Sequence, residues 1–431
     1  MALQVEQGSP ATSKSLHVLG VWCGLAAATW LAGAEAPTKL VTAGFSPFLI
    51  SLSMVTGVFV ARWTLPTLLK GTGYVFVDLR QKRHLVIWAI LAGSLWAVGN
   101  TLTVFAVRDV GLSIAFPLWN INSLVGVFWG WFFFRELRGA GLKNWAKVVG
   151  GAVAILGGAV LLGYASTSEP SSSAHRALAG IAAAVGAGLM FGTMYIPYRK
   201  AYLSGMNPVS FVTVFTVGEL ATMSTLAVWF RGGLFPLLAE LREARPALFW
   251  LFLGGFCWVV GDLFQNYAAK YIGIGRGIPL SNTNQLWGLA WGALVFGEFA
   301  GRGSWAQSLV IVGSITMILG AVAISSAVAP ESEQASTGEA IARECQRYGL
   351  SLELAQASQR GEDTVAREGP RRRWWDALIV AGAVLVFVGL ARIAQIPPIR
   401  MRPGWTVLLA ATMLFSLWAC GALLWKRTRF S

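Results

Sequence analysis

Long runs of apolar residues recur from one end of this chain to the other, separated by short polar segments. Each run is about 20 residues long, which is the length that an α-helix needs to cross roughly 30 Å of hydrocarbon. The pattern predicts an all-α polytopic membrane protein. The twelve predicted helices are 16–34, 45–66, 85–106, 111–134, 145–164, 178–197, 208–230, 247–269, 274–297, 305–328, 375–396 and 404–425.

One stretch of this pattern is duplicated. Residues 88–136 align without a gap onto residues 250–298, and 18 of the 49 positions are identical. Apolar composition alone repeats leucine or glycine, but it does not return a proline, two asparagines and two tryptophans in one register. The shared residues of the first copy include Trp96, Gly99, Gly111, Pro117, Leu118, Asn120, Asn122, Leu124, Gly126, Trp129, Gly130, Phe134 and Glu136.

The duplication covers the third and fourth predicted helices and returns in the eighth and ninth, so the repeat is five helices long. An odd number of crossings makes the second copy enter the membrane from the opposite side. We therefore expect two inverted five-helix repeats, 16–164 and 178–328, related by a pseudo-two-fold axis in the membrane plane. A ten-helix core of this kind is typical of alternating access.

Three segments lie outside this core: a polar N-terminus at 1–15, a polar segment at 329–374 and two further helices at 375–425. The polar segment is predicted to be either a short amphipathic helix over 338–360 or a flexible linker. The last two helices have no counterpart in the repeat. A role in oligomerisation or stability fits them, and the sequence assigns them no chemistry.

The basic residues indicate the orientation of the chain. The formal net charge is +14, but the lysines and arginines flank predicted helices, so nucleic acid is not an expected partner. By the positive-inside rule, both termini and the segment 329–374 lie in the cytoplasm, and the chain lies in the cytoplasmic membrane. The basic residues assigned to inside loops of the core are Arg62, Lys70, Arg80, Lys82, Arg83, Arg135, Arg138, Lys143, Lys147, Arg199, Lys200, Lys270 and Arg276.

Composition argues against an enzyme and against a metalloprotein. Hydrophobic residues make up 55% of the chain and charged residues only 13%. The four cysteines are scattered and the three histidines sit at the edges of predicted helices, so neither a disulfide framework nor a metal site is predicted. The sequence contains no Walker motif, so we expect no cofactor and no ATP hydrolysis by this chain.

A proline is followed by amide side chains in the fourth and ninth predicted helices. Proline removes a backbone donor, and amides offer donors and acceptors at a depth where unsatisfied polar groups are costly. These side chains therefore face a wet cavity or bond to another helix. A wet cavity suits a sugar or polyol that lies against an aromatic ring. The candidate substrate-binding residues are Asn120, Asn122, Asn282, Asn284 and Gln285, with Trp119 and Trp287 as aromatic faces.

Two acids, Glu219 and Asp262, lie deep in apolar runs. An ionised carboxylate is unfavourable there, so each acid is neutral, paired or exposed to a water-filled pathway, and such acids are functional candidates by default. We expect at least one of them to couple transport to a proton or to bind substrate hydroxyls. The structural alternative for Asp262 is a hydrogen bond to Gln265, to Asn266 or to a tyrosine of a neighbouring helix.

The two halves resemble the drug/metabolite transporter superfamily over about residues 16–328. The resemblance rests on a glycine-containing run that ends in Pro-Leu, GLSIAFPL at 111–118 and GIGRGIPL at 273–280, and on Glu136 or Glu298 at the end of the same helix. These runs look most like the glucose/ribose porter branch, which implies ten helices and sugar transport. The two C-terminal helices depart from that pattern.

We therefore expect a secondary transporter that moves a small polar metabolite, a sugar or polyol, by alternating access. One alternative is an exporter of amino acids or other metabolites on the same fold, which needs fixed charges such as Glu219, Asp262 or Arg276. A membrane enzyme or lipid-handling protein needs a polar cluster near one interface, and the sequence shows none. The expected partners are a small-molecule substrate, a coupling proton and the lipid bilayer, with oligomerisation left open.

Overall fold

The computed structural model describes residues 13–41, 44–134, 141–167, 174–300, 303–327, 330–365, 372–395 and 401–431. Within these ranges every regular element is a helix. Ten helices there are long and apolar enough to cross a membrane, so the chain is a multi-pass membrane protein. The candidate spans are Ser15–Lys39, Pro47–Leu69, Leu85–Val110, Leu142–Ala165, His175–Leu203, Pro208–Phe230, Arg245–Ile272, Ser304–Ile324, Trp375–Ile393 and Pro403–Thr428.

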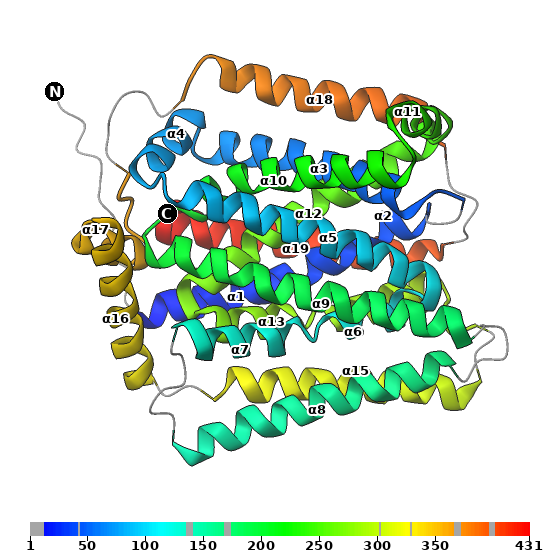
Figure 1. The fold of residues 1–431 in the computed structure, drawn as a ribbon, viewed down its shortest axis with the longest axis horizontal. Helices are drawn as coiled ribbons and strands as arrows, with labels where there is room; N and C mark the ends of the chain where they lie inside the picture. Colours follow the sequence, from blue (N-terminus) through cyan, green and yellow to red (C-terminus); the bar gives the residue numbers. More distant parts are fainter. Residues whose placement is uncertain are drawn as a thin grey trace.

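The long helices lie roughly parallel in one bundle, with α8 and α15 along one edge and α18 along the opposite edge (Figure 1). Their bounds are α1 (Ser13–Gly33), α3 (Pro47–Leu69), α5 (Leu85–Val110), α8 (Leu142–Thr167), α9 (Ala174–Leu203), α10 (Pro208–Phe230), α12 (Arg245–Ile272), α15 (Ser304–Ser325), α18 (Trp375–Ile393) and α19 (Pro403–Thr428). Two further helices, α2 (Glu35–Lys39) and α11 (Leu234–Glu243), lie at one end of the bundle. At the other end are α4 (Thr72–Gln81), α16 (Pro330–Tyr348) and α17 (Leu352–Gln359).

Two more segments run along the bundle, and each is broken midway. The sequence predicted continuous helices over 111–134 and 274–297, and the structure corrects both predictions. The pieces of the first are α6 (Leu112–Trp119) and α7 (Asn122–Phe134). The pieces of the second are α13 (Ile274–Ser281), α14 (Asn284–Ala290) and a π-helical turn, η1 (Trp291–Val295).

Each break follows a proline by about three residues. Pro117 has no backbone N–H, so α6 loses the bond to the carbonyl four residues back, and just past the proline the chain tightens into a 3₁₀-like turn. The Asn120 N–H donates to the Pro117 carbonyl at 3.1 Å, and the Ser123 N–H donates to the Asn120 carbonyl at 3.2 Å. Past Pro279 the Gln285 N–H likewise donates three residues back. The tighter turn places asparagine side chains at each break.

The helices of two pairs, α3 with α12 and α5 with α10, approach each other closely. A Cβ atom on Gly57 of α3 or on Gly255 of α12 would overlap a backbone carbonyl oxygen of the facing helix. A Cβ atom on Gly93 of α5 would likewise overlap a backbone carbonyl oxygen of α10, and one on Gly218 of α10 would overlap a backbone carbonyl oxygen of α5. Because no side chain separates the backbones, the helices approach closely.

The polar segment after α15 contains two helices, α16 and α17, which pack on one end of the bundle. Lys200 at the end of α9 lies 3.0 Å from the Glu344 carboxylate of α16. The His84 ring stacks on Tyr348 with centroids 3.9 Å apart, and Gln359 of α17 donates to a backbone carbonyl of α9 at 2.6 Å. Of the two predicted forms, helix or flexible linker, this segment takes the helical one.

The last two helices pack on different helices of the bundle. In α19 the Met413 carbonyl accepts a hydrogen bond from the Trp30 indole of α1 at 2.9 Å. In α18 the Phe387 ring lies edge-on to Phe252 of α12, with centroids 5.0 Å apart. Both helices are therefore attached to the rest of the bundle, and neither contributes a residue to the cavity described next.

Candidate substrate cavity between the two broken helices

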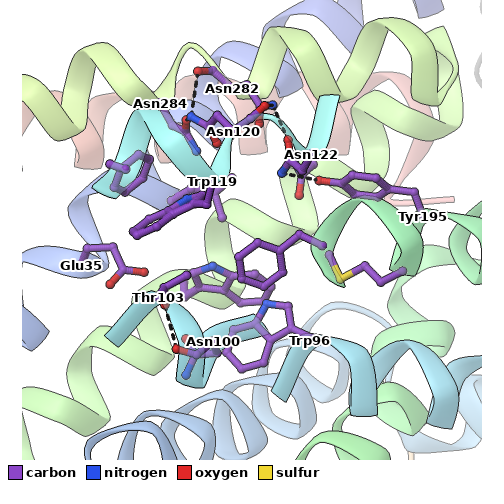
Figure 2. Close-up of a pocket in the computed structure, with 16 residues that line it drawn as sticks. Glu35, Trp96, Asn100, Thr103, Trp119, Asn120, Asn122, Tyr195, Asn282 and Asn284 are labelled. Carbon is purple, nitrogen blue, oxygen red and sulfur yellow. Dashed lines mark hydrogen bonds between the residues drawn. The ribbon is translucent and has the colours of Figure 1, made fainter. Parts of the chain in front are cut away.

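A cavity lies where α6 gives way to α7 and where α13 gives way to α14 (Figure 2). Its volume is about 50 Å³. That is room for about three or four water molecules. Residues of α1, α2, α5, α9 and α12 complete its wall. The lining residues are Leu31, Glu35, Trp96, Asn100, Thr103, Phe116, Trp119, Asn120, Asn122, Phe191, Met194, Tyr195, Trp258, Gln265, Asn282 and Asn284.

Amide side chains from the two broken helices meet at one wall of the cavity (Figure 2). The Asn120 Nδ2 donates to Oδ1 of Asn284 at 2.8 Å, and the Asn282 Nδ2 donates to Oδ1 of Asn122 at 2.6 Å. Asn122 also donates to the Tyr195 hydroxyl at 3.4 Å. Each break is thus hydrogen-bonded to the other, which satisfies polar groups at a depth where unpaired ones are costly.

The structure brings most of the predicted binding residues together. All four predicted asparagines line the cavity, as does Trp119. Gln285 and Trp287 do not line it. Gln285 is buried, and its Oε1 has no hydrogen-bond partner in the described part of the chain. Trp287 is half-buried and packs against the hydrophobic core. The sequence left two interpretations of these asparagines open, a cavity lining and a hydrogen bond between helices. In the structure they do both.

Aromatic rings form much of the remaining wall. Trp96 and Trp258, one from each copy of the duplicated sequence, pack with ring centroids 4.6 Å apart. Phe116 and Trp119 pack with centroids 4.7 Å apart. Figure 2 shows Trp96 across the cavity from the amides. The sequence carried a signal for this tryptophan pair, since Trp96 and Trp258 occupy one register of the repeat, but it did not mark them as site residues.

One carboxylate lies in the cavity wall, and the sequence pattern did not mark it either. Glu35 begins α2, and its side chain points toward the cavity from the side of Trp119 and Thr103 (Figure 2). The first apolar run was predicted to end at residue 34, so Glu35 fell just outside the predicted helix. In the structure it lies within the first candidate span, Ser15–Lys39.

The two predicted intramembrane acids lie outside the cavity lining and share one arginine. The Arg62 Nη2 is 2.8 Å from Oδ2 of Asp262, and its Nη1 is 3.7 Å from Oε2 of Glu219. All three side chains are fully buried. The Tyr198 hydroxyl donates to Oδ1 of Asp262 at 3.4 Å. This is a hydrogen bond to a tyrosine of a neighbouring helix, as the structural alternative for Asp262 requires.

The structure shows that the sequence-based assignment of Arg62 to an inside loop is wrong. The sequence placed it in an inside loop, because a basic residue near the end of an apolar run commonly marks the end of a span. It lies instead inside α3, with its guanidinium carbon 3.9 Å from the centroid of the Phe215 ring. A buried cation needs acidic partners, and here two acids face one cation. Such a triad is neutral when one carboxyl carries a proton.

The cavity therefore offers amide donors and acceptors, ring faces and one carboxylate. Among the residues that the structure describes, no group of three or more His, Cys, Asp or Glu side chains could hold a metal ion. Amides and a carboxylate bind hydroxyl groups, and indole rings cover the apolar faces of a ring-shaped ligand. Figure 2 shows both kinds of group pointing into one space.

Fold and cavity define a polytopic helical membrane protein with a polar site at broken helices. The EamA-like transporter family matches residues 178–320 of the chain, which is most of the second predicted repeat. The chain therefore carries an EamA-like transporter domain of the drug/metabolite transporter superfamily. This confirms the superfamily resemblance seen in the sequence.

The chain is also similar to curated proteins. A "Putative sugar uptake protein" of Streptococcus pyogenes serotype M1 is 35% identical over 109 residues, which are 24% of this chain and 36% of that protein. The chain thus spans about a third of the length of that relative. Another protein of this printed name, from Listeria innocua serovar 6a, is 24% identical over 58% of this chain and 82% of its own length. A solved crystal structure that covers 72% of this chain has a TM-score of 0.41 and 15% identity.

Proposed function

We propose that this protein is a secondary transporter that moves a sugar or related polyol across the cytoplasmic membrane by alternating access. The observation that carries the proposal is the cavity at the two helix breaks, lined by asparagines from both broken helices and by tryptophans. The EamA-like domain supports a transporter, and the printed names of the streptococcal and listerial relatives support a sugar.

The chemistry of the cavity suits a polyhydroxylated substrate. Each sugar hydroxyl donates one hydrogen bond and accepts others, and Asn120, Asn122, Asn282 and Asn284 offer both kinds of group. In the structure these amides bond to one another. A hydroxylated substrate that enters replaces those bonds with its own. The volume of about 50 Å³ is smaller than a sugar ring, so the cavity must widen to admit one.

The helix packing supports inverted repeats that move against each other. α3 meets α12 at Gly57 and Gly255, and α10 meets α5 at Gly218 and Gly93. In the predicted repeat, α3 corresponds to α10 and α5 corresponds to α12. The contact of α3 with α12 is therefore the counterpart of the contact of α10 with α5. Small residues at such contacts let helices slide or rock without a side-chain clash.

The orientation in the membrane is part of the same proposal. We propose that both termini and α16–α17 lie in the cytoplasm. The basic residues Lys82, Arg83 and Lys200, which lie at the bundle end that α16 covers, support this orientation. The domain organisation follows, with repeats at 16–164 and 178–328 and an appended pair of helices at 375–425. Proton coupling also belongs to the proposal, because the chain carries several acids at membrane depth.

Uptake into proteoliposomes tests the proposed function. The purified protein is reconstituted and offered labelled pentoses, hexoses, polyols and amino acids, first in exchange with unlabelled substrate and then with an imposed pH gradient. We expect saturable exchange of at least one sugar or polyol. Exchange of amino acids alone, with no sugar or polyol exchanged, would overturn the substrate class. A higher KM for exchange in Asn282→Ala, with normal amounts of folded protein, would assign the activity to the cavity.

Glu35 favours a second candidate, transport of a metabolite that carries an amino group. A carboxylate beside Trp119 and the Trp96–Trp258 pair is an environment that binds an ammonium group through an ion pair and through ring faces. The amino acids of the same panel, with amino sugars added to it, decide between the two candidate functions. Preference for the amino compound over its neutral analogue, lost in Glu35→Gln, would establish this candidate.

A further inference from the structure

We propose that Glu35 is the residue that takes up the coupling proton. Its carboxylate binds one proton when the cavity opens to one side of the membrane and releases that proton when the cavity opens to the other side. The inference rests on the proposed function, because it assigns a role within the same cavity. It replaces Glu219 and Asp262, the two acids that the sequence favoured for this role.

Glu35 differs from every other buried acid that the structure describes, because it alone has no partner. Its carboxylate makes no hydrogen bond or ion pair with a described residue, although the residue is only 8% exposed. The other buried acids are each held by a cation or by hydrogen-bond donors. They are Asp78 with Lys82, Glu219 and Asp262 with Arg62, Glu344 with Lys200, and Asp376 with Thr72.

The charged groups around Glu35 do not compensate for it. On its own helix, Lys39 lies 3.0 Å from Glu298. α12, which packs against α2, carries Asp262 beside Arg62, and its two basic residues, Arg245 and Lys270, lie at its two ends. α1 carries His17 near its opposite end, and the other titratable group of the cavity wall is the Tyr195 phenol.

A lone carboxylate at this depth is stabilised in only two ways. It can bind a proton and become neutral, or it can accept hydrogen bonds from water and substrate in the cavity. Because both act on the same oxygens, proton binding and substrate binding influence each other, and by linkage the influence is reciprocal. A cavity with room for about three or four waters would give the proton a path to the carboxylate.

The Arg62 triad lacks this access. Glu219 and Asp262 have no exposed surface, and neither lines the cavity. The Phe215 ring covers the Arg62 guanidinium at 3.9 Å, and the Trp258 ring, which does line the cavity, lies 5.3 Å from the same group. A proton on the triad is therefore separated from the substrate by an aromatic wall, whereas a proton on Glu35 is in the site.

Two readouts in reconstituted protein separate coupling from transport. Exchange of labelled substrate at equal pH on both sides needs binding and translocation but no net proton movement. Accumulation driven by a gradient of one pH unit needs coupling, and one proton per neutral substrate supports about tenfold accumulation. We expect the steady-state accumulation by Glu35→Gln to fall from that level to about onefold. Because Glu35 lines the cavity, the KM for exchange by this variant is measured as well; a higher KM slows accumulation but does not lower its final ratio. The matched control is Glu243→Gln, an exposed acid on α11, which should accumulate like the unmodified protein.

Infrared difference spectroscopy of the protein in lipid provides a readout that needs no substrate. On a change from acid to neutral pH, a protonated carboxyl band should disappear in the unmodified protein and be absent throughout from Glu35→Gln. Glu35→Gln that still accumulates substrate, or that keeps the titrating band, overturns the inference. Loss of accumulation in Glu219→Gln with Glu35→Gln intact overturns it in favour of the triad. If no sugar, polyol or amino compound is exchanged, the proposed function fails, while the infrared titration still decides whether Glu35 binds a proton.

Discussion

The Arg62 guanidinium of α3 lies 2.8 Å from the Asp262 carboxylate of α12, although 200 positions separate the two residues in the sequence. Glu219 of α10 approaches the same guanidinium to 3.7 Å. One buried cation thus joins three helices, and two of them belong to the second predicted repeat. Such a contact holds the halves of the bundle together through charge, in a place where water cannot replace a missing partner.

Arg62→Ala should destabilise the folded protein strongly. Removal of the cation leaves two buried acids without a partner, and breaking a buried pair in this way costs about 3–5 kcal/mol. The measurement is thermal or denaturant unfolding of the purified protein in detergent. Arg343→Ala removes an exposed arginine on α16 and serves as the control. An Arg62→Ala protein as stable as that control would show that the triad contributes little.

Asn282→Ala should weaken substrate binding more than it weakens folding. Asn282 donates to Asn122 and to Ser123 across the two breaks, and it lines the cavity. A hydrogen bond contributes about 1 kcal/mol. The loss of one or two hydrogen bonds between the Asn282 amide and the substrate therefore raises the KM for exchange by roughly 5- to 30-fold. Asn144→Ala, far from the cavity on α8, is the control. Unchanged KM with less folded protein would favour a purely structural role for the amide.

Gly255→Ala should prevent α3 and α12 from packing as they do in the structure. The added Cβ would overlap the carbonyl oxygen of Met54 on the facing helix, and backbone atoms cannot move aside as a flexible side chain can. We expect a large loss of folded protein, measured by size-exclusion chromatography and thermal unfolding. Gly150→Ala is the matched control on α8, where a Cβ meets nothing within 4 Å, and it should be tolerated. Equal behaviour of the two variants contradicts the close approach.

Docking of α16 should weaken at acidic pH. The His84 ring stacks on Tyr348 of α16, and burial lowers the pKa of His84 from its ordinary value of 6.5. Glu344 opposes this shift, and Lys200 and Lys82 add to it. Because the pKa is lower with α16 docked, the undocked form binds more protons below about pH 6.5. Docking is therefore at full strength above that pH and weakens as the pH falls toward the lowered pKa.

Hydrogen exchange of the α16 amides, corrected for the intrinsic effect of pH, measures this docking. His84→Phe keeps an aromatic ring on Tyr348 and removes the titration, so its α16 protection should not depend on pH in this range. The same pH dependence in His84→Phe as in the unmodified protein would assign the effect to another group.

A cysteine placed on α16 should be reachable only from the cytoplasm. In a background without the four native cysteines, Glu339→Cys lies on an exposed part of α16 and should react with an impermeant maleimide only after the cells are permeabilised. Arg242→Cys on α11, at the opposite end of the bundle, should react in intact cells. Reversal of the two reactivities would invert the proposed topology.

Much of the fold could be predicted from the sequence, because apolar runs and basic loops are local signals. The runs mark Pro47–Leu69 or Pro208–Phe230 as spans whatever their neighbours are. The break at Asn120 is different. Pro117 weakens the helix, but the hydropathy of 111–134 is the same for a straight helix and a broken one, so its division is a tertiary property.

The site was predicted in part for the same reason. The asparagines stood out because amides are rare in apolar runs and these recur in the repeat. Glu35 and Arg62 did not, since each lies near the end of an apolar run, where a charge is ordinarily in solvent. Their environments depend on residues far along the chain, Asp262 for Arg62 and Trp119 and Asn282 for Glu35. A single sequence holds no record of those neighbours.

The crossed amides have a mechanical consequence. Asn120 is bonded to the residue just past the second break, and Asn282 to the residue just past the first. Neither helix break can bend alone without losing a hydrogen bond to the other, so the two breaks are mechanically coupled. A molecule that binds between the two breaks and replaces these hydrogen bonds with its own frees both breaks at once. Under the proposed function that molecule is the substrate, so substrate binding would free both breaks together.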